Sequence, residues 1–456
     1  MRDLNYKFRD IVQERYEQNV KSGLEAVEYI KNSTAIYKGK PVPCLYMPKI
    51  FSVEAHEYLK HAARTIYVIL EKVMAKYLCD PKYRTLFPFP KALEELILSE
   101  AGYPCLLPIA RIDIFLDEDD FSFKFCEFNA DGSSAMNEDR ELNLAIKNAD
   151  AMQKMGEDYD FETFEFFDSW VRVFVDIYSS YEKKVSNPNI IITDFIDGDV
   201  STEFTEFKNA FIRAGYDAEI VDVRSLLYEQ GILKTSEGKP VHAIYRRAVT
   251  RDVMDNYEKV RSFVKAITDG NVCSIGHFRT QIIHNKIIFK ILHMAETFEF
   301  LTEEESAFVV RHVPKTYVLE EGKFDLDDAL QNKRDWLIKP EDLYASRGVF
   351  AGVDTPQEAW EKAVKENMSK GYLLQEYVTP YKSENLNFND NPRPSFEKFG
   401  NITGMFVYGG KLQGFYSRGG PQGIISGLTG GLTMASVVAK NRSCNAKISA
   451  DNKPPC

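Results

Sequence analysis

The sequence lacks the features of a membrane or secreted protein. No stretch of about 18 residues is apolar and free of charge, so no transmembrane helix is predicted. The charged N-terminus MRDLNYKFRD has no apolar core of a signal peptide. The seven cysteines are odd in number and have neither a CxxC pair nor zinc-ligand spacing, which favours reduced thiols over a disulfide framework. We therefore expect a cytoplasmic protein without a membrane partner.

The chain also lacks an excess of basic residues. Its formal charge of −11 argues against binding to a phosphate backbone, which needs many Lys and Arg side chains, so no nucleic-acid partner is expected. The 456 residues, 44% of them hydrophobic and 27% charged, are typical of a globular protein that is long enough for two or three domains.

Several segments have clear secondary-structure patterns. Up to about residue 100, apolar residues recur at three and four positions, which predicts amphipathic helices. IARIDIFL and FSFKFCEFN predict a β-hairpin, residues 188–248 alternate between strand and helix patterns, and NITGMFVYGGKLQGFYSR predicts a second hairpin with a Gly-Gly turn. The sequence therefore indicates a mixed α/β fold.

The first hairpin carries polar side chains at alternate positions. Arg111 and Asp113 share one face of its first strand, and Glu127 and Asn129 share one face of its second. A loop with an odd number of residues, such as EDD, places all four on one face with Arg111 opposite Glu127, whereas a four-residue loop breaks this alignment. The oxygen donors of Asp113, Glu127 and Asn129 suit Mg²⁺ bound together with phosphates. A partly exposed ladder of ion pairs is the alternative.

The loop ADGSSAMNE follows this hairpin directly. Its backbone N–H groups and the hydroxyls of Ser133 and Ser134 could hold an anion beside the carboxylates. The alternative is a simple turn in which one of these serines is the N-cap of the next helix.

A second group of signals lies nearer the C-terminus. Lys339 ends the apolar strand WLIK, and the glycine loop YASRGVFAG follows it, a pattern that fits a phosphate-binding lysine and a closing loop. Gln375 and Glu376 interrupt the apolar strand YLLQEYV, which fits recognition of an adenine edge. Taken singly, each feature also fits an ordinary strand end, surface hairpin or edge strand.

The order of these motifs resembles a known family. The succession ARID…CEFNADGSS…NKIIFKIL…WLIKPEDLYASRGVFAG…YLLQEYV…GKLQGFYSR is similar to the synthetase part of glutathionylspermidine synthase and its relatives, a circularly permuted branch of the ATP-grasp ligases. The resemblance covers roughly residues 105 to 430. It implies a circularly permuted ATP-grasp fold of the α/β (α+β) class, with an inserted α/β domain that resembles a pre-ATP-grasp domain.

The resemblance also implies boundaries. We expect an N-terminal helical region at 1–100, the metal-ligand part of the ATP-grasp domain at 101–185, the inserted substrate domain at 186–268, the nucleotide-binding region with its lid at 269–440, and a polar tail at 441–456.

Particular residues acquire roles from the same likeness. The implied metal ligands, for two Mg²⁺ ions, are Asp113, Glu127 and Asn129. The implied ATP-binding residues are Lys286, Lys339, Ser346, Arg347, Gly348, Gln375, Glu376 and Val378. The residues implied at the reacting groups are Arg111, Arg418 and Ser134, with Ser133, Arg246 and Arg247 contacting substrate.

The chain departs from its relatives in three ways. Arg246 and Arg247 occupy the place of a Lys-Thr pair, the end GLTGGLTMASVV lacks the usual Pro-His close, and we expect no N-terminal amidase domain. The identity of the substrates therefore does not follow from the resemblance.

The implied reaction joins a carboxylate to an amine at the expense of ATP. A small-molecule or peptide acid would form an acylphosphate, and the amine would then displace phosphate. An ATP-dependent phosphotransferase, with His284 as the residue of interest, and a non-catalytic nucleotide-binding regulator are the alternatives. Asp197, Asp199 and Glu203 could receive a polyamine, or could form a solvated acidic loop before an N-capped helix. The oligomeric state is open.

Overall fold

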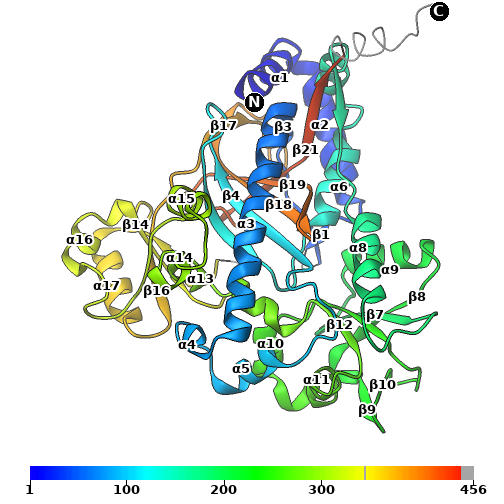
Figure 1. Cartoon of the computed structure of the whole chain (residues 1–456). Helices are drawn as coiled ribbons and strands as arrows, with labels where there is room; N and C mark the ends of the chain where they lie inside the picture. The colour runs from blue at the N-terminus through cyan, green and yellow to red at the C-terminus, as the bar shows by residue number, and fades with distance from the viewer. Residues whose placement is uncertain (38, 344–345, 443–456) are drawn as a thin grey trace, which may run out of the picture.

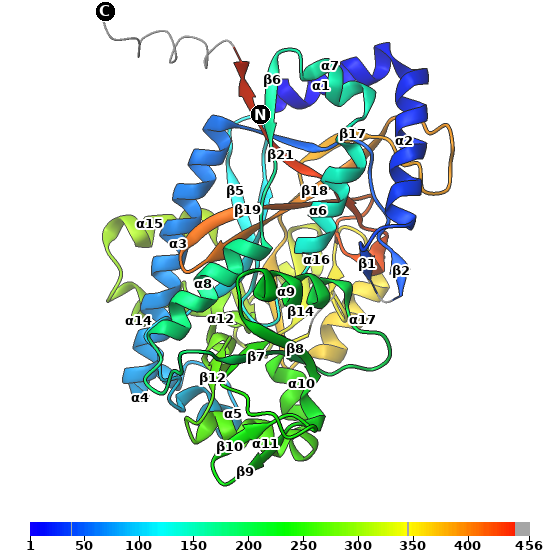
Figure 2. The same ribbon diagram turned by 90° about the vertical axis from the view of Figure 1, so that its right-hand side faces the viewer.

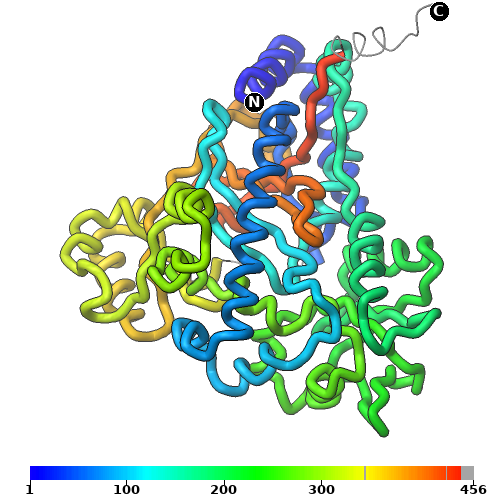
Figure 3. Tube along the Cα trace, viewed as in Figure 1, coloured from blue at the N-terminus to red at the C-terminus, as the bar shows by residue number. Residues whose placement is uncertain are grey.

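The computed structural model describes residues 1–37, 39–343 and 346–442, so most of the predicted tail at 441–456 lies outside the described residues. Figure 1 shows a central sheet crossed by the long helix α3 (Val53–Cys79), with one lobe beside the sheet and another below it. In the tube of Figure 3 the red C-terminal strand runs beside blue N-terminal chain. This strand, β21 (Ser436–Asn441), pairs in parallel with β3 (Lys49–Ser52), so the two ends of the chain share a small sheet.

The first 100 residues are mainly helical, as predicted. α3 begins where Ser52 Oγ accepts a hydrogen bond from the N–H of Ala55, and its buried side chains recur at three and four positions. The other helices of this region are α1 (Arg2–Glu14), α2 (Tyr16–Lys31), α4 (Pro81–Arg84) and α5 (Lys91–Leu98). The short strands β1 (Ile36–Tyr37) and β2 (Lys40–Pro41), which sequence reasoning missed, form a small ribbon.

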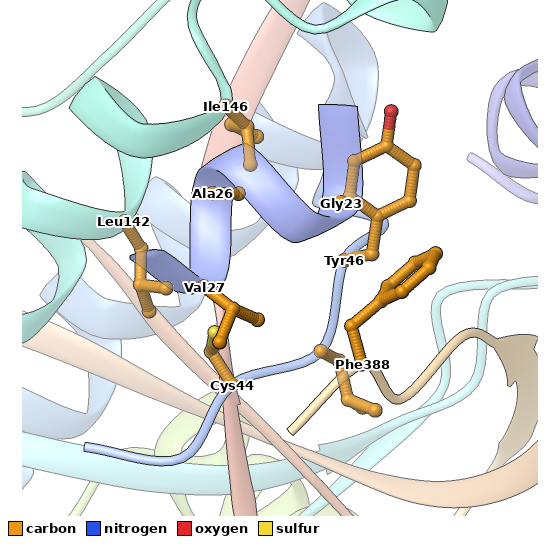
Figure 4. Close-up of a pocket in the computed structure, with 9 residues that line it drawn as sticks. Gly23, Ala26, Val27, Cys44, Tyr46, Leu142, Ile146 and Phe388 are labelled. Carbon is orange, nitrogen blue, oxygen red and sulfur yellow. The ribbon is translucent and has the colours of Figure 1, made fainter. Parts of the chain in front are cut away.

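A small apolar cavity lies between α2 and α6 (Met136–Ile146). Figure 4 shows side chains from both helices, together with Tyr46 and Phe388, around it. Gly23 permits this packing, because an added Cβ would lie 2.3 Å from the ring of Phe388. The polar residues of the two predicted hairpins are absent from its lining, so we interpret it as a packing gap in the core rather than as a ligand site.

The central sheet combines the two predicted hairpins. Its strand order is β20-β19-β18-β4-β5, with β17 paired to β18. Its members are β4 (Ile109–Leu116), β5 (Phe123–Asn129), β17 (Lys382–Asn385), β18 (Glu397–Tyr408), β19 (Lys411–Gly420) and β20 (Leu432–Met434). Because β4 pairs with β18, segments almost 300 residues apart in sequence form one surface.

The first hairpin has a different register from the predicted one. Arg111 lies opposite Asn129 and Asp113 lies opposite Glu127, so the prediction that Arg111 faces Glu127 is wrong. The prediction that all four side chains share one face holds in the pairing.

A β-bulge reconciles the loop length with this pairing. The N–H of Asp117 donates to the carbonyl of Ser122 at 2.8 Å, and the enclosed loop has four residues rather than three. Such a loop alone would turn the two polar sets to opposite faces. The register shifts directly after the pair of Asp113 and Glu127, leaving Cys126 as the extra residue of β5, and this shift brings the polar sets back to one face.

The predicted α/β segment forms a parallel sheet of order β12-β11-β7-β8, seen below the central sheet in Figure 2. Its strands are β7 (Asn189–Asp194), β8 (Asp217–Asp222), β11 (Ala243–Arg246) and the unpredicted β12 (Cys273–Ile275). Around it lie α8 (Phe167–Ser179), α9 (Thr202–Arg213), α10 (Thr250–Asp255), α11 (Arg261–Thr268), β9 (Leu227–Glu229) and β10 (Ile232–Lys234).

The lobe beside the sheet has the antiparallel order β13-β16-β14-β15. Its strands are β13 (Thr316–Val318), β14 (Trp336–Pro340), β15 (Phe350–Ala351) and β16 (Tyr372–Glu376). Its helices are α15 (Glu303–His312), α16 (Leu326–Gln331) and α17 (Gln357–Asn367).

The segment HNKIIFKILHMAETFEFL and the residues just before it form short helical turns rather than one continuous helix. These are α12 (Gln281–His284), α13 (Ile288–Ile291) and α14 (Ala295–Phe298). The first break falls at Lys286, whose N–H donates to the carbonyl of Glu341 beyond β14. The remaining elements are α7 (Asp150–Met155) and β6 (Tyr159–Glu162), the latter paired with β21.

Candidate active site

Two arginines converge on one buried carboxylate at the centre of the sheet. Arg111 contacts Asp113 through Nε–Oδ1 at 2.8 Å and Nη2–Oδ2 at 3.1 Å. Arg418 of β19 reaches the same Oδ2 with Nη2 at 3.0 Å. Strand β18 lies between β4 and β19 and carries Gly404 opposite Asp113; a Cβ added there would lie 2.8 Å from Asp113 Oδ1 and 2.9 Å from Arg111 Cδ. The glycine therefore leaves space for the ion pair of Arg111 and Asp113, which Arg418 joins.

Lysines surround the neighbouring carboxylate on β5. Lys286 Nζ lies 3.3 Å from Glu127 Oε1 and also donates to the carbonyl of Leu343 at 2.8 Å. Burial opposes ionisation of Glu127, but the positive charges of Lys286, Lys339 and Arg111 outweigh burial and lower its pKa to about 2. Glu127 is therefore ionised at physiological pH.

Lys339 projects from β14 toward this region. Its Nζ lies 3.4 Å from the carbonyl oxygen of Cys126 and 4.8 Å from the centre of the Phe289 ring. Burial lowers the pKa of Lys339 to about 8. A buried ammonium with a reduced pKa beside a basic neighbour favours the approach of an anion.

Several polar atoms near these charges have no hydrogen-bond partner within the described residues. They are Asn129 Nδ2, Gln281 Oε1, His284 Nδ1 and Arg418 Nε. Buried polar atoms are normally satisfied, so each of these atoms leaves a hydrogen bond for a ligand or a water molecule to make.

The loop after β5 is fastened to this centre through its backbone. Ser133 Oγ donates to the carbonyl of Asn129, and the carbonyl of Ser134 accepts from Arg111 Nη1 at 2.9 Å. Ser134 itself is exposed. The alternative interpretation, in which Ser133 or Ser134 is the N-cap of α6, is wrong, because the N-cap residue is Ala135. Instead Glu203 Oε2 accepts from the N–H of Ala135 at 2.9 Å.

The two residues predicted to recognise adenine have internal partners. Gln375 is buried on β16 and donates from Nε2 to Thr316 Oγ1 at 2.8 Å. Glu376 Oε2 accepts from the N–H of Lys315 at 3.0 Å, and Val378 follows the strand in a partly buried position.

Part of the predicted closing loop lies outside the described residues, namely 344 and 345. In its described part, Ser346 has φ +55° and Gly348 has φ +70°, and Arg347 is exposed. These three residues lie in the connection between β14, which carries Lys339, and β15.

Arg246 and Arg247, predicted to contact substrate, each bind a carboxylate of the protein. Arg246 Nη2 lies 2.6 Å from Asp131 Oδ1, and this pair is fully buried. Arg247 Nη2 contacts Glu203 Oε1 at 3.1 Å, also buried. These contacts join the α/β sheet to the loop after β5. For Glu203 the sequence left two interpretations open, a polyamine contact or part of a solvated acidic loop before an N-capped helix. In the fold Glu203 is buried and bonded within the protein, and the N-cap residue of α9, Ser201, makes no side-chain capping bond.

The chain has few of the usual signs of a dedicated metal site. Among the residues that the structure describes, no group of three or more His, Cys, Asp and Glu side chains is placed to hold a metal ion. The predicted set of Asp113, Glu127 and Asn129 contains two carboxylates and an amide on one face. Such an oxygen-only set fits Mg²⁺ that takes its other ligands from phosphates and water.

Sequence reasoning missed two residues at the opposite border of this centre. Tyr416 Oη donates to Glu138 Oε2, and its ring lies 5.5 Å from the guanidinium carbons of both Arg111 and Arg418. The signal in the sequence was the period-two relation of Tyr416 to Arg418 in FYSR, which places both on one face of the strand.

The comparisons with known proteins agree with this architecture. No family model matches the sequence, and a search of curated proteins gave no match. The structure is similar to that of a glutathione synthetase-like effector (GSS30) from Globodera pallida in its apo form, with a TM-score of 0.60, 11% identity, and coverage of 91% of this chain and 96% of that one. The two chains share a mixed α/β fold, and at this identity the likeness concerns the fold alone.

A second solved structure is more distant. It is described as "Putative gamma-glutamylcysteine synthetase" from Methylobacillus flagellatus KT, and matches with a TM-score of 0.40, 9% identity, and coverage of 85% of this chain and 89% of that one.

Across the described part of the chain, no helix has both the length and the apolar character needed to cross a membrane.

Proposed function

We propose that this chain is an ATP-dependent carboxylate–amine ligase with a circularly permuted ATP-grasp order, similar to glutathionylspermidine synthase. The observation that carries the proposal is the meeting of Arg111, Asp113 and Arg418 beside a glutamate, Glu127, that Lys286 contacts. The fold shared with a glutathione synthetase-like effector supports the same class of reaction.

In this proposal, ATP lies between the central sheet and the lobe of β14 and β16. Lys286 and Lys339 meet its phosphates, because both are buried cations without a full set of carboxylate partners. Gln375, Glu376 and Val378 border the adenine from β16. Ser346, Arg347 and Gly348 belong to the loop that closes over the phosphates, where positive φ brings the backbone close.

Asp113, Glu127 and Asn129 would hold Mg²⁺, two ions in all. Bound there, the metal would supply charge neutralisation and alignment of the phosphates. The contribution of the chain is to keep Glu127 ionised through its lysines and to fix Asp113 between two guanidinium groups.

The reacting acid would meet Arg111 and Arg418. Both guanidiniums are held rigidly, so they stabilise charge that develops on the carboxylate and the transferred phosphoryl group without reorganisation. Ser134, exposed in the loop that Arg111 anchors, offers its hydroxyl to the substrate, and Ser133 shapes that loop. In the same proposal Arg246 and Arg247 support the loop from below rather than contact substrate directly.

Product analysis tests the proposal. Purified protein is incubated with Mg-ATP and pooled acids (amino acids and short γ-glutamyl peptides) and amines (amino acids and polyamines), and products are identified by mass spectrometry. We expect ADP together with a new mass equal to acid plus amine minus water. AMP, or ADP with no condensed product from any pool, would contradict the ligase. Asp113→Ala and Glu127→Ala should abolish the product.

A phosphotransferase is the second candidate, because His284 Nδ1 has no partner among the described residues and lies near Lys286 and Glu127. Burial lowers the pKa of His284, which favours the neutral imidazole that could accept a phosphoryl group. This candidate predicts an acid-labile phosphoprotein that forms without any amine and is lost in His284→Ala.

A further inference from the structure

One row of side chains crosses four strands of the central sheet. The cross-strand pairs join Glu127 to Asp113, Asp113 to Gly404, and Gly404 to Tyr416. Glu127 and Tyr416 are therefore separated by three strand spacings, about 14 Å. The lysines surround the Glu127 end, and the two arginines lie over the middle of the row.

The Tyr416 end of the row terminates at another carboxylate. Glu138, in the first turn of α6, accepts from Tyr416 Oη and from Thr433 Oγ1 at 3.4 Å. Its other oxygen, Oε1, accepts no hydrogen bond from the residues that the structure describes, and the side chain is only partly buried. The centre thus has a carboxylate on each side of the two arginines. Glu127 lies beside lysines, and Glu138 accepts hydrogen bonds from the hydroxyls of Tyr416 and Thr433.

We propose that Glu138 binds the amine substrate as its ammonium form and takes the proton that the amine must lose before it attacks, with Tyr416 as the positioning residue of this carboxylate. This inference rests on the proposed ligase function. It assigns the two partners to opposite sides of Arg111 and Arg418: phosphates at Glu127, and a cationic amine at Glu138.

The asymmetry of charge supports this assignment. Lys286 and Lys339 make the Glu127 side favourable to an anion and unfavourable to an ammonium group. On the opposite side, α9 contributes Glu203, which acts on Glu138 as a like charge. A cation therefore finds its counter-charge beside Glu138 and not beside Glu127.

The ionisation of Glu138 is set by groups from each neighbouring element. Burial raises its pKa, the hydrogen bond from Tyr416 lowers it, Glu203 raises it, and Arg418 and Arg111 lower it. The net pKa lies above the ordinary value for glutamate, which makes this carboxylate a stronger base than an exposed one.

The proton and electron balance of the step is complete. The ammonium gives one proton to Glu138, and the nitrogen lone pair then forms a bond to the acyl carbon of the acylphosphate. The bond from that carbon to the phosphate oxygen breaks, and phosphate leaves with the electron pair. The second proton of the attacking nitrogen goes to the departing phosphate, and Glu138 returns its proton to water when the amide leaves.

Hydroxylamine separates this role from acylphosphate formation. It is uncharged at neutral pH and reacts with an acylphosphate without needing an ammonium site or a base. With Mg-ATP and the pooled acids, wild-type protein should give a hydroxamate. Glu138→Gln should keep hydroxamate formation within about threefold while amide formation from the pooled cationic amines falls roughly 100-fold or more.

Tyr416→Phe is the second variant, since it keeps the ring beside the guanidiniums and removes only the hydroxyl, which donates to Glu138 and lies 3.2 Å from Thr433 Oγ1. It should raise the KM for the amine and leave hydroxamate formation intact. Glu141→Gln is the matched control, because Glu141 lies one turn along α6 and contacts Tyr29, Thr34 and Arg140 instead. It should change neither reaction.

Two results would overturn the inference while leaving the ligase in place. The first is that the Glu138→Gln variant forms the amide at the wild-type rate. The second is that a Glu138→Gln or Tyr416→Phe variant with the wild-type unfolding temperature loses hydroxamate and amide formation to the same extent. Absence of hydroxamate and amide with wild-type protein would instead overturn the proposed ligase function, and this inference with it.

Discussion

Asp113 on β4 and Arg418 on β19 are not neighbours in the sheet, yet their side chains meet across β18 at 3.0 Å. The strand between them carries Gly404, the residue directly opposite Asp113. The missing side chain leaves room for Arg111 and Asp113, whose atoms a Cβ at that position would meet. Arg418, 305 residues from Asp113 in the sequence, converges on the carboxylate of this ion pair.

Gly404→Ala should disable the centre while the fold survives. The new Cβ would lie 2.8 Å from Asp113 Oδ1 and 2.9 Å from Arg111 Cδ, so the ion pair must shift. Overpacking of this kind costs about 1–3 kcal/mol of stability. We expect at least a tenfold loss of ATP-dependent product formation with a modest fall in Tm, measured by steady-state kinetics and thermal unfolding.

Gly427→Ala is the matched control, since a Cβ there meets nothing within 4 Å. It should have wild-type activity and stability. Wild-type activity of Gly404→Ala would contradict the expectation that the reaction needs Arg111 and Asp113 in their present positions.

The protonation of Lys339 should set an upper pH limit on kcat/KM for ATP. Its pKa of about 8 means that the free protein loses this positive charge as the pH rises through 8, whereas Glu127, with a pKa of about 2, stays ionised throughout. The kcat/KM for ATP, which reports the free enzyme, should therefore decline above pH 8. Lys339→Arg should have a lower but flat profile between pH 7 and 9.5, because a guanidinium stays protonated there.

The same lysine allows a test of stability that needs no substrate. Its pKa is below the ordinary value of 10.5 because of burial, so the protonated form opposes folding. Lys339→Met should be more stable than wild type below about pH 8, and the difference should vanish as the pH rises toward 10.5. A stability difference independent of pH in urea unfolding, or a flat wild-type kinetic profile, would count against the reduced pKa.

Arg246 should prove structural. Its guanidinium contacts Asp131 at 2.6 Å in a fully buried pair, and Asp131 also accepts from the N–H of Thr250 at 2.6 Å. Breaking a buried pair leaves an uncompensated charge, so Arg246→Ala should lower the free energy of unfolding by about 3–5 kcal/mol. Arg251→Ala, which removes the exposed pair with Asp255, should change it little. Loss of substrate affinity with unchanged stability would return Arg246 to the substrate site.

The sequence allowed the elements around the centre to be predicted, but not its register. Alternation placed Arg111 with Asp113 and Glu127 with Asn129, because side chains alternate along any strand. The pairing between the two strands depends on loop length and on the bulge at Cys126, and neither has a signal in the local sequence. The face was therefore predictable, and the partner across the strand was not.

Contacts between residues far apart in the sequence could not be predicted either. Glu203 reads as part of an exposed acidic loop, since the residues around it are polar. In the fold it caps α6 and pairs with Arg247, a partner that only the packing of α9 against the loop after β5 supplies. Glu138 was missed for the same reason, because its contact with Tyr416 joins residues 278 positions apart.

The most direct test of the central claim follows the carboxylate oxygen of the acid. With an accepted acid labelled with ¹⁸O in its carboxylate, Mg-ATP and the amine, phosphorylation of the carboxylate predicts that one labelled oxygen appears in the released phosphate, detected by mass spectrometry or by the ³¹P isotope shift. Phosphate free of ¹⁸O, or label in AMP, would contradict an acylphosphate route through Arg111, Asp113 and Arg418.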